Sequence, residues 1–191
     1  MSLSSLAGII ASDGHLAKDN STIYVINKDK KFIEDVQNML EMYCGKRGKY
    51  KSAKSGFGSD RYLLRVNSAK LVKQLNKVYN VPIGNKSATI VPPNINQKES
   101  LEYIGGWIAG DGSVTIDRTR PKIEIWSKSS AIIHWVKDIL EKETIESRLF
   151  TEKKKNMFIL RIGKKEAVKK FYSKVIIPHH RKQIRLQQLC S

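Results

Sequence analysis

The chain has 191 residues, of which 40% are hydrophobic, and it carries 35 Lys and Arg against 18 Asp and Glu, for a formal net charge of +17. This length and apolar content can bury one full core or two small coupled cores. The charge points first to a polyanionic partner, usually a nucleic acid, because solubility or a Lys-rich thermostable surface rarely needs so large an imbalance.

The sequence also excludes several classes of protein. Its two cysteines, Cys44 and Cys190, give neither a disulfide framework nor a metal-binding spacing. Its four histidines are scattered, and the adjacent pair His179 and His180 lacks further ligands nearby, so no zinc site is expected. The first apolar run is short and lacks the basic residues that begin a secretion signal, and no run reaches the length of a membrane span. We therefore expect a soluble intracellular protein.

Helical and strand patterns alternate through the first half of the chain. Apolar residues recur at helical spacing in three segments, and β-rich runs lie between them. Ser68 is expected to cap the N-terminus of one helix and Gly45 to end another. In chain order we predict a helix at 3–13, a strand at 23–26, a helix at 29–44, a basic strand within 47–54, a strand at 62–66 and a helix at 68–80.

The second half repeats the first. The stretch GIIASDGH at 8–15 returns as WIAGDGS at 107–113, with the two aspartates 98 residues apart, and three further pairs follow in the same order at offsets of 100, 96 and 96 residues. The pairs match 23–40 with 123–140, 62–78 with 158–174, and Pro82–Lys86 with Pro178–Lys182. These ordered matches indicate an internal duplication.

The duplication predicts an α+β fold of two pseudo-symmetric halves, each in the order helix, two strands, helix, two strands, helix. We place the N-terminal half at 1–83 and the C-terminal half at 101–191, where the repeat predicts helices at 130–143 and 164–176. The segment 84–100 contains turn-forming residues and two prolines and is expected to be the linker.

Each Asp-Gly pair follows a helix that is rich in small residues. Gly8 and Ser12 lie four residues apart, as do Gly106 and Gly110, so each helix presents a flat groove to which another backbone can approach closely. Close contact is a reason to tolerate glycines that cost up to about 1 kcal/mol each in a helix. We predict that the two helices pack in parallel and join the halves.

This packing would bring Asp13 and Asp111 together at the ends of the two helices, with Gly14 and Gly112 as left-handed C-terminal caps. Each carboxylate then faces the negative end of a helix dipole and repels the other, unless a cation lies between them. Oxygen ligands suit Mg²⁺, which can activate water and stabilise a leaving oxygen beneath a DNA backbone. The alternative, that Asp-Gly is only a turn after a helix, does not explain two matched copies.

In LAGIIASDG (6–14) and IGGWIAGDG (104–112), each followed by the same strand and helix pattern, the chain resembles the LAGLIDADG homing endonucleases in their single-chain, two-motif form. The resemblance implies two αββαββα halves that form a saddle, with antiparallel sheets in the DNA major groove and the motif helices at the central minor groove. It implies a monomer that cuts both strands with a divalent metal, usually Mg²⁺ (or Mn²⁺), and leaves short 3′ overhangs. Asp13 and Asp111 would be the metal ligands, one for each strand, whereas Ala11 and Ala109 replace an internal acid of the family motif.

The resemblance also suggests further active-site residues. The family places a polar residue, often Gln or Asn, at the end of the second strand, which corresponds here to Asn27 and Ser127, each followed by a lysine (Lys28 and Lys128). Such groups would orient water, although a polar N-cap of the following helix is an equally good explanation. Ser127 matches less well than Asn27, so we expect the two half-sites to be unequal.

The family also has a basic residue late in each half, near the scissile phosphate. Lys86 and Lys182, at the matching Pro-x-x-x-Lys positions, are the candidates, and would polarise the attacking water or neutralise charge in the transition state. A plain phosphate contact or a solvated side chain is the alternative.

Basic residues alternate along the predicted strands and should share one face of each sheet. A sheet in a major groove needs such a face, although an ordinary solvent face looks similar, and most of these cations would contact phosphates rather than bases. The candidates are Lys49, Lys51, Arg61 and Arg65 in the first half and Arg118, Arg120, Lys122, Lys153 and Arg161 in the second, together with Lys28 and Lys128. Because the two faces differ, the target should be pseudo-palindromic or asymmetric.

The leading hypothesis is a monomeric, Mg²⁺-dependent, site-specific endonuclease acting on double-stranded DNA. An intron RNA maturase, or a DNA-binding protein on the same fold that has lost cleavage, is the second. A basic ribosome-associated protein would share the charge but would have no use for paired Asp-Gly helix ends. The compact length favours a free-standing or intron-encoded protein.

Overall fold

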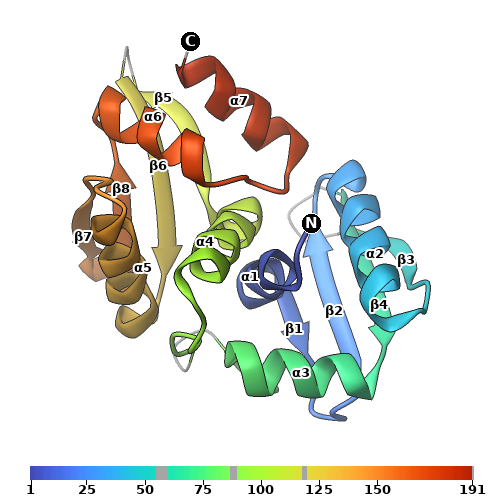
Figure 1. Ribbon diagram of the computed structural model, residues 1–191. Helices are drawn as coiled ribbons and strands as arrows, with labels where there is room; N and C mark the ends of the chain where they lie inside the picture. Colours follow the sequence, from blue (N-terminus) through green and yellow to red (C-terminus); the bar gives the residue numbers. More distant parts are fainter. Residues whose placement is uncertain (55–59, 87–89, 118–119, 191) are drawn as a thin grey trace.

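The computed structural model describes residues 1–54, 60–86, 90–117 and 120–190. It has the α+β architecture predicted from the repeat, with two halves on either side of a central helix pair (Figure 1). The first half contains α1 (Leu3–Asp13), β1 (Gly14–Leu16), β2 (Thr22–Asn27), α2 (Lys30–Cys44), β3 (Lys49–Lys54), β4 (Asp60–Asn67) and α3 (Ala69–Tyr79). The second contains α4 (Gln97–Asp111), β5 (Ser113–Asp117), β6 (Arg120–Ser127), α5 (Ser130–Lys142), β7 (Arg148–Glu152), the 3₁₀ turn η1 (Lys153–Lys155), β8 (Met157–Ile162), α6 (Lys165–Lys174) and α7 (His180–Cys190).

The two sheets have the same topology. Their strand orders are β1-β2-β4-β3 and β5-β6-β8-β7, and all neighbouring strands are antiparallel. Helices cover one face of each sheet, and a single hydrophobic cluster runs through both halves. The duplicated sequence therefore folds into two equivalent units around one continuous core.

Local signals set the ends of most helices. The Ser68 side chain accepts a hydrogen bond from the N–H of Leu71, and Gly45 ends α2 in the left-handed conformation at φ 65°, both as predicted. Helix α4 begins at Gln97, after a capping box formed by Asn96 and Glu99. The motif helix thus starts inside the segment 84–100 that was expected to be linker, because the capping box satisfies its first N–H groups.

Two local predictions were wrong. Gly14 and Gly112 are not left-handed caps, since their φ angles are −99° and −80°. A Cβ on Gly14 would lie 2.6 Å from the Cα of Ile10, and one on Gly112 would lie 2.5 Å from the Cα of Ile108. Glycine is required because the chain folds back closely over the last helical turn.

Residues 153–155 form the turn between β7 and β8 instead of part of a strand, and the helix α7 was not predicted.

The motif helices α1 and α4 pack in parallel at the centre of the molecule, as predicted (Figure 1). A Cβ on Gly8 would lie 2.8 Å from the N atom of Trp107 and closer still to the carbonyl oxygen of Tyr103. Symmetrically, a Cβ on Gly106 would lie 2.9 Å from the carbonyl carbon of Ser5. The two glycines, 98 residues apart, are thus related by the pseudo-twofold axis, and each makes room for the other helix's backbone.

The segment that follows α3 in the first half and the segment that follows α6 in the second half each contact the opposite half. The hydroxyl of Ser129, at the start of α5, donates to the carbonyl of Ile90 at 2.7 Å. In the other direction, the His179 ring stacks on Phe32 at 4.7 Å, and Arg181 Nε lies 3.2 Å from Asp29, the N-cap of α2. These crossing segments matter for the site because they carry Lys86 and Lys182.

Candidate active site

The structure brings the two repeated aspartates together, as predicted. Asp13 is the last residue of α1 and Asp111 the last residue of α4, and a Cβ on Gly110 would lie 3.1 Å from Asp13 Cγ. Burial and the nearby charge of Asp111 raise the pKa of Asp13 to about 6, although a hydrogen bond from Asn27 opposes the shift. The pair is therefore a strained concentration of negative charge that a cation would relieve.

The raised pKa predicts a stability difference that depends on pH. The folded state binds the Asp13 proton more tightly than the unfolded chain, so ionised Asp13 costs stability above pH 6 and the cost disappears as the pH falls toward 4. Since the side chain is partly exposed, we expect Asp13→Asn to raise the metal-free unfolding free energy by about 1–2 kcal/mol at pH 7.5. Urea unfolding in EDTA measures this gain, and an equal gain at pH 4.5 would contradict the assignment.

The residues at the ends of β2 and β6 differ in what they contact. The Asn27 amide donates to Asp13 Oδ2 at 2.6 Å, while its oxygen accepts from the N–H of Asp29 at 2.9 Å. Ser127 accepts from the N–H of Ser129 at 3.0 Å and lines a hollow beside Asp111. Neither is the helix N-cap, a role taken by Asp29 and Ser129. Among the contacts described, a side-chain amide thus holds the aspartate in the first half only.

The two candidate lysines lie at the carboxyl ends of the motif helices. Lys86 Nζ donates to the carbonyls of Ile10 at 3.0 Å and Ala11 at 2.8 Å, and to that of Ser12. Burial lowers the pKa of each lysine to about 8, against the opposing charges of Asp13 and Asp111, so both are mainly protonated at pH 7. Lys182 contacts the matching carbonyls of α4, those of Ile108 (2.9 Å), Ala109 (2.8 Å) and Gly110 (2.8 Å), and also that of Gly112 (2.8 Å), just after the helix.

This lysine arrangement adds a contact at the helix ends that the sequence did not predict. A cation does face each negative helix terminus, but it belongs to the protein and arrives on a crossing segment. Each ammonium donates to the last carbonyls of its helix, of which those of Ile10 and Ile108 also accept from the N–H groups of Gly14 and Gly112. The lysines therefore fix the last turn from which each aspartate projects, besides adding positive charge to the site.

We expect Lys86→Met and Lys182→Met each to lower the unfolding free energy by about 2 kcal/mol, since hydrogen bonds to a charged group are lost while the carbonyls stay partly buried. Lys128→Met is the matched control, because Lys128 is exposed beside the same site. Urea unfolding at pH 7.5 compares the three variants. Equal stability of all three would show that the lysines do not cap the helices.

The donor set suits a hard divalent cation. Within the described ranges, no group of three or more His, Cys, Asp or Glu side chains is placed to hold a metal. The protein thus offers two carboxylates, Asp13 and Asp111, and Mg²⁺ is commonly held by one or two carboxylates together with waters and substrate phosphates. The pair fits an ion that is completed by a bound phosphodiester.

A hollow of about 420 Å³ adjoins the pair on the side of the second half. It brings together four residues that the sequence had suggested separately, namely Lys86, Asp111, Ser127 and Lys128, and it also contains Ser12. Trp107 and Trp126 form part of its wall, and the Trp107 indole N–H donates to the carbonyl of Trp126 at 3.4 Å. The space beside Asp111 therefore combines charged and hydroxyl groups with an apolar, partly aromatic wall.

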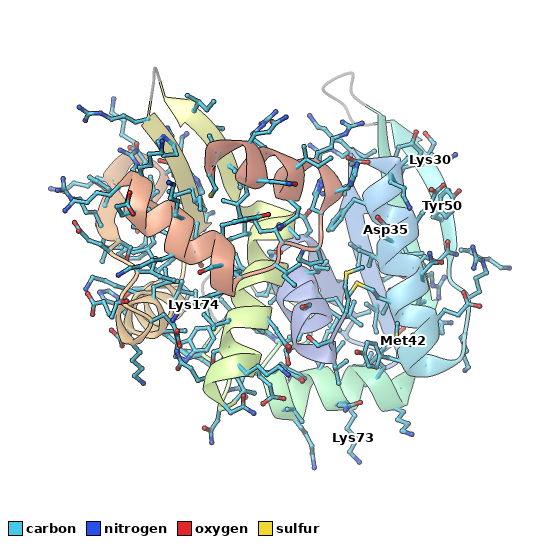
Figure 2. The ribbon with its side chains drawn as sticks, turned by 45° about the horizontal axis from the view of Figure 1, so that its top comes forward. Lys30, Asp35, Met42, Tyr50, Lys73 and Lys174 are labelled. Carbon is cyan, nitrogen blue, oxygen red and sulfur yellow. The ribbon has the colours of Figure 1, made fainter. Side chains whose placement is uncertain are left out.

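The outer face of the first sheet carries the predicted basic residues. Lys49 and Tyr24 lie directly opposite Arg65 on the neighbouring strands, while Leu64 and Val66 point into the core. The positive charge also extends to helices, since Lys73 projects into solvent from α3 (Figure 2). Residues of the outer face include Lys49, Lys51, Arg61 and Arg65, and Lys28 follows β2 as an exposed residue.

The outer face of the second sheet is also basic. Arg120 and Lys122 alternate with the half-buried Pro121 and the core residue Ile123 on β6, and Arg161 lies opposite Glu124 and Arg148. Arg148 was missed in the sequence, although its repeat counterpart Lys49 was a candidate. The remaining candidates are Lys153, which is exposed in the β7–β8 turn, Lys128, which lies beside Asp111, and Arg118, which is outside the described residues.

Comparison with known proteins gives a consistent family and fold. The model of the LAGLIDADG-like domain matches twice, at residues 2–79 and 98–175. Similar solved structures include the homing endonuclease I-DmoI in complex with DNA and Ca, at 19% identity and a TM-score of 0.66, covering 91% of this chain and 87% of that one. Another is the homing endonuclease I-WcaI bound to its DNA recognition sequence, at 16% identity and a TM-score of 0.66, covering 96% and 84%.

The fold similarity also extends to full-length DUF199/WhiA from Thermatoga maritima, at 17% identity and a TM-score of 0.68, with 98% of this chain and 58% of that chain covered. The search of curated proteins gave no match. Among the described residues, no helix has the length and apolar character needed to span a membrane.

Proposed function

Because this chain belongs to the LAGLIDADG family, with two family domains in one polypeptide, we propose that it is a site-specific endonuclease that makes a staggered double-strand break in DNA. The proposed enzyme is a monomer, depends on Mg²⁺ or Mn²⁺, and recognises a long target that is pseudo-palindromic or asymmetric. The solved complexes of I-DmoI with DNA and Mn, and of I-WcaI with its recognition sequence, support the choice of partner and cofactor.

The observation that carries this proposal is the pairing of Asp13 with Asp111. Both acids are present, and both lie at the ends of tightly packed helices, where burial and the charge of Asp111 raise the pKa of Asp13. DNA binding alone does not use this costly arrangement, whereas a metal site beneath a phosphodiester can use both carboxylates as ligands. The bound metal would supply an activated water and stabilise the leaving oxygen.

The other residues of the site would position these acids and the DNA. Asn27 holds Asp13 through its amide, while Lys86 and Lys182 fix the helix ends and are protonated near the backbone to be cut. Ser127 and Lys128 line the hollow beside Asp111, where they would contact water or a phosphate oxygen. The basic outer faces of the two sheets would supply salt-dependent affinity, with Lys49, Arg65 and Arg161 among the contributing residues.

A DNA-binding protein without cleavage is the second candidate. The similarity to DUF199/WhiA favours it, because that fold match lies outside the structures named as homing endonucleases. The weaker second half-site, with Ser127 where Asn27 stands in the first, also fits a loss of activity. The similar solved complexes contain DNA and give no support to the intron RNA partner considered from the sequence.

A cleavage screen tests the proposal without knowledge of the target. Closed circular plasmids that carry long randomised inserts are incubated with the protein in Mg²⁺ or in EDTA, and linear products are captured and sequenced. We expect cuts in Mg²⁺ alone, enriched for one extended sequence. Sequence-specific retention of plasmids without linear products, in both Mg²⁺ and Mn²⁺, would support the binding protein instead.

A further inference from the structure

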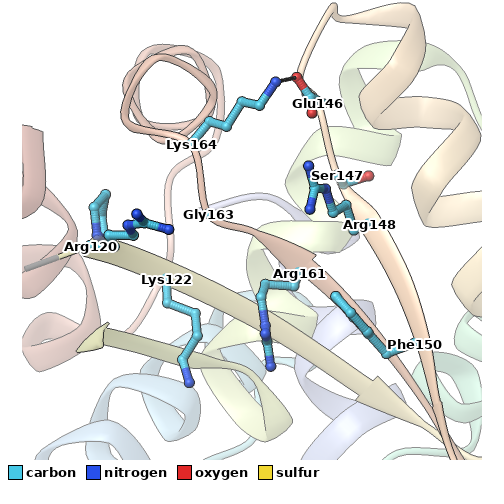
Figure 3. A pocket seen from close by; sticks show the side chains of 10 residues that line it. Arg120, Lys122, Glu146, Ser147, Arg148, Phe150, Arg161, Gly163 and Lys164 are labelled. Carbon is cyan, nitrogen blue, oxygen red and sulfur yellow. Dashed lines mark ion pairs between the residues drawn. The ribbon is translucent and has the colours of Figure 1, made fainter. Parts of the chain in front are cut away.

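The outer face of the second sheet is hollowed where β6, β7 and β8 meet. The hollow has a volume of about 660 Å³ and shares no lining residue with the one beside Asp111. Its one acidic lining residue, Glu146, is paired with Lys164 at 2.6 Å (Figure 3). Basic side chains dominate the lining of the hollow, beside one aromatic ring; they are Arg120, Lys122, Arg148, Arg161 and Lys164, and the ring is that of Phe150.

Arg161 is held by hydrogen bonds to a buried carboxylate and by an aromatic ring. Its Nε lies 2.8 Å and its Nη2 lies 2.7 Å from Glu124 Oε1, and its Cζ lies 4.7 Å from the centre of the Phe150 ring. The Glu124 side chain is only 7% exposed, whereas that of Arg161 is 38% exposed. The carboxylate therefore lies beneath the arginine and cannot itself reach a ligand.

This contact leaves one edge of the guanidinium available. Arginine has five N–H donors in a planar fork, and Glu124 engages only the Nε and Nη2 side. The outer edge, formed by Nη1 and Nη2, can still donate two parallel hydrogen bonds to a pair of acceptors. In the major groove, the O6 and N7 atoms of guanine are such a pair, and arginine is the residue that most often reads them.

The equivalent place in the first half lacks this support. Arg65 occupies the position of Arg161 in its sheet, opposite Tyr24 where Arg161 faces Glu124. The Arg65 Cζ lies 5.9 Å from the centre of the Tyr24 ring. An aromatic ring restrains a guanidinium less than a buried carboxylate does, because stacking leaves rotation in the plane free. Arg65 and Arg161 thus occupy equivalent positions in the two sheets, and the guanidinium of Arg161 is held more firmly than that of Arg65.

We infer that Glu124 fixes Arg161 as a guanine-reading residue, so that the target half facing the second sheet has a strictly required guanine at one position. This inference rests on the proposed DNA-binding function. An ordered donor pair loses little side-chain freedom on binding and rejects an imperfect acceptor pattern, which sharpens discrimination between bases. The base opposite Arg65 is correspondingly less restricted. The position of Arg161 favours contact with a base over contact with a phosphate, because its strand β8 is an inner strand of the sheet.

Binding selection from a pool of randomised duplexes tests the inference. Binding in Ca²⁺ is compared for the wild-type protein, Arg161→Lys, Glu124→Gln and the matched control Arg65→Lys. The duplexes that each protein retains, and any that it cuts, are sequenced. We expect Arg161→Lys and Glu124→Gln to lower the preference for one guanine by about 10-fold or more. Arg65→Lys should change the base preference in the other half-site by a smaller factor.

The outcomes separate the inference from the proposed function. If wild-type protein enriches no sequence, the proposal of a site-specific DNA partner fails, whatever Arg161 does. If wild-type protein is selective but Arg161→Lys weakens binding to all sequences equally, Arg161 contacts only phosphate and the inference is wrong. Thermal unfolding of each variant checks folding, and Arg161→Lys, which keeps the charge, decides the question if Glu124→Gln does not fold.

Discussion

Asp13→Asn and Asp111→Asn are each expected to lower the rate of double-strand cleavage by about three orders of magnitude. A metal ligand supplies several kcal/mol of transition-state stabilisation, and each 1.36 kcal/mol corresponds to about tenfold in rate. Asparagine keeps the size of the side chain but removes the charge that the two acids share at the helix ends. The target selected in the plasmid screen is the substrate, and supercoiled, nicked and linear forms are measured over time.

The nicked form makes this experiment more informative than a loss of activity alone. If each acid serves one strand, a single substitution should leave slow conversion to nicked circles, and the preferred strand should differ between the two variants. Asp138→Asn is the control, since Asp138 is an exposed carboxylate on α5. Binding to the same target should be retained by both active-site variants. Full cleavage by either of them would remove the aspartate pair from the mechanism.

Gly8→Ala and Gly106→Ala are expected to destabilise the fold by more than about 3 kcal/mol each. In each variant the added methyl group would meet backbone atoms of the opposite motif helix, at 2.8 Å from the N atom of Trp107 or 2.9 Å from the carbonyl carbon of Ser5. Overpacking of a core commonly costs about 1–3 kcal/mol, and backbone atoms cannot rotate away as a side chain can. The helices must therefore separate, and the aspartate pair separates with them.

Thermal and urea unfolding measure the loss of stability. Gly163→Ala is the matched control, because its added methyl group would meet its nearest neighbour, the carbonyl oxygen of Pro121, at 3.9 Å. We expect the control to unfold like the wild-type protein and both motif variants to lose cleavage at temperatures where they remain folded. A Gly106→Ala variant with unchanged stability would contradict the close packing of α1 against α4.

Several features followed from short stretches of sequence because their causes are local. Helical periodicity, the Ser68 cap and the left-handed Gly45 depend on neighbours within about one helical turn. The duplication added long-range information, because a motif that occurs twice with small residues four apart predicts a partner for itself. For this reason the sequence alone predicts the pairing of Asp13 with Asp111.

Other features depend on contacts that join distant parts of the chain. Lys86 reaches the end of α1 across 74 to 76 residues, and Lys182 reaches the end of α4 across 70 to 74. A Pro-x-x-x-Lys pattern marks these lysines as equivalent, but it does not say that they cap helices. Likewise, Gly14 is needed because the chain folds back over Ile10, and its sequence is equally consistent with a left-handed cap.

The amino-acid sequence alone determined the duplicated α+β architecture, the family and the paired acids, because periodicity, capping and repetition are recorded in neighbouring residues. Only the tertiary structure decided the roles of the lysines and the difference between the sheet faces. The Glu124–Arg161 contact joins β6 to β8 across 37 residues, and strand register, which no local pattern specifies, places the buried carboxylate under the arginine.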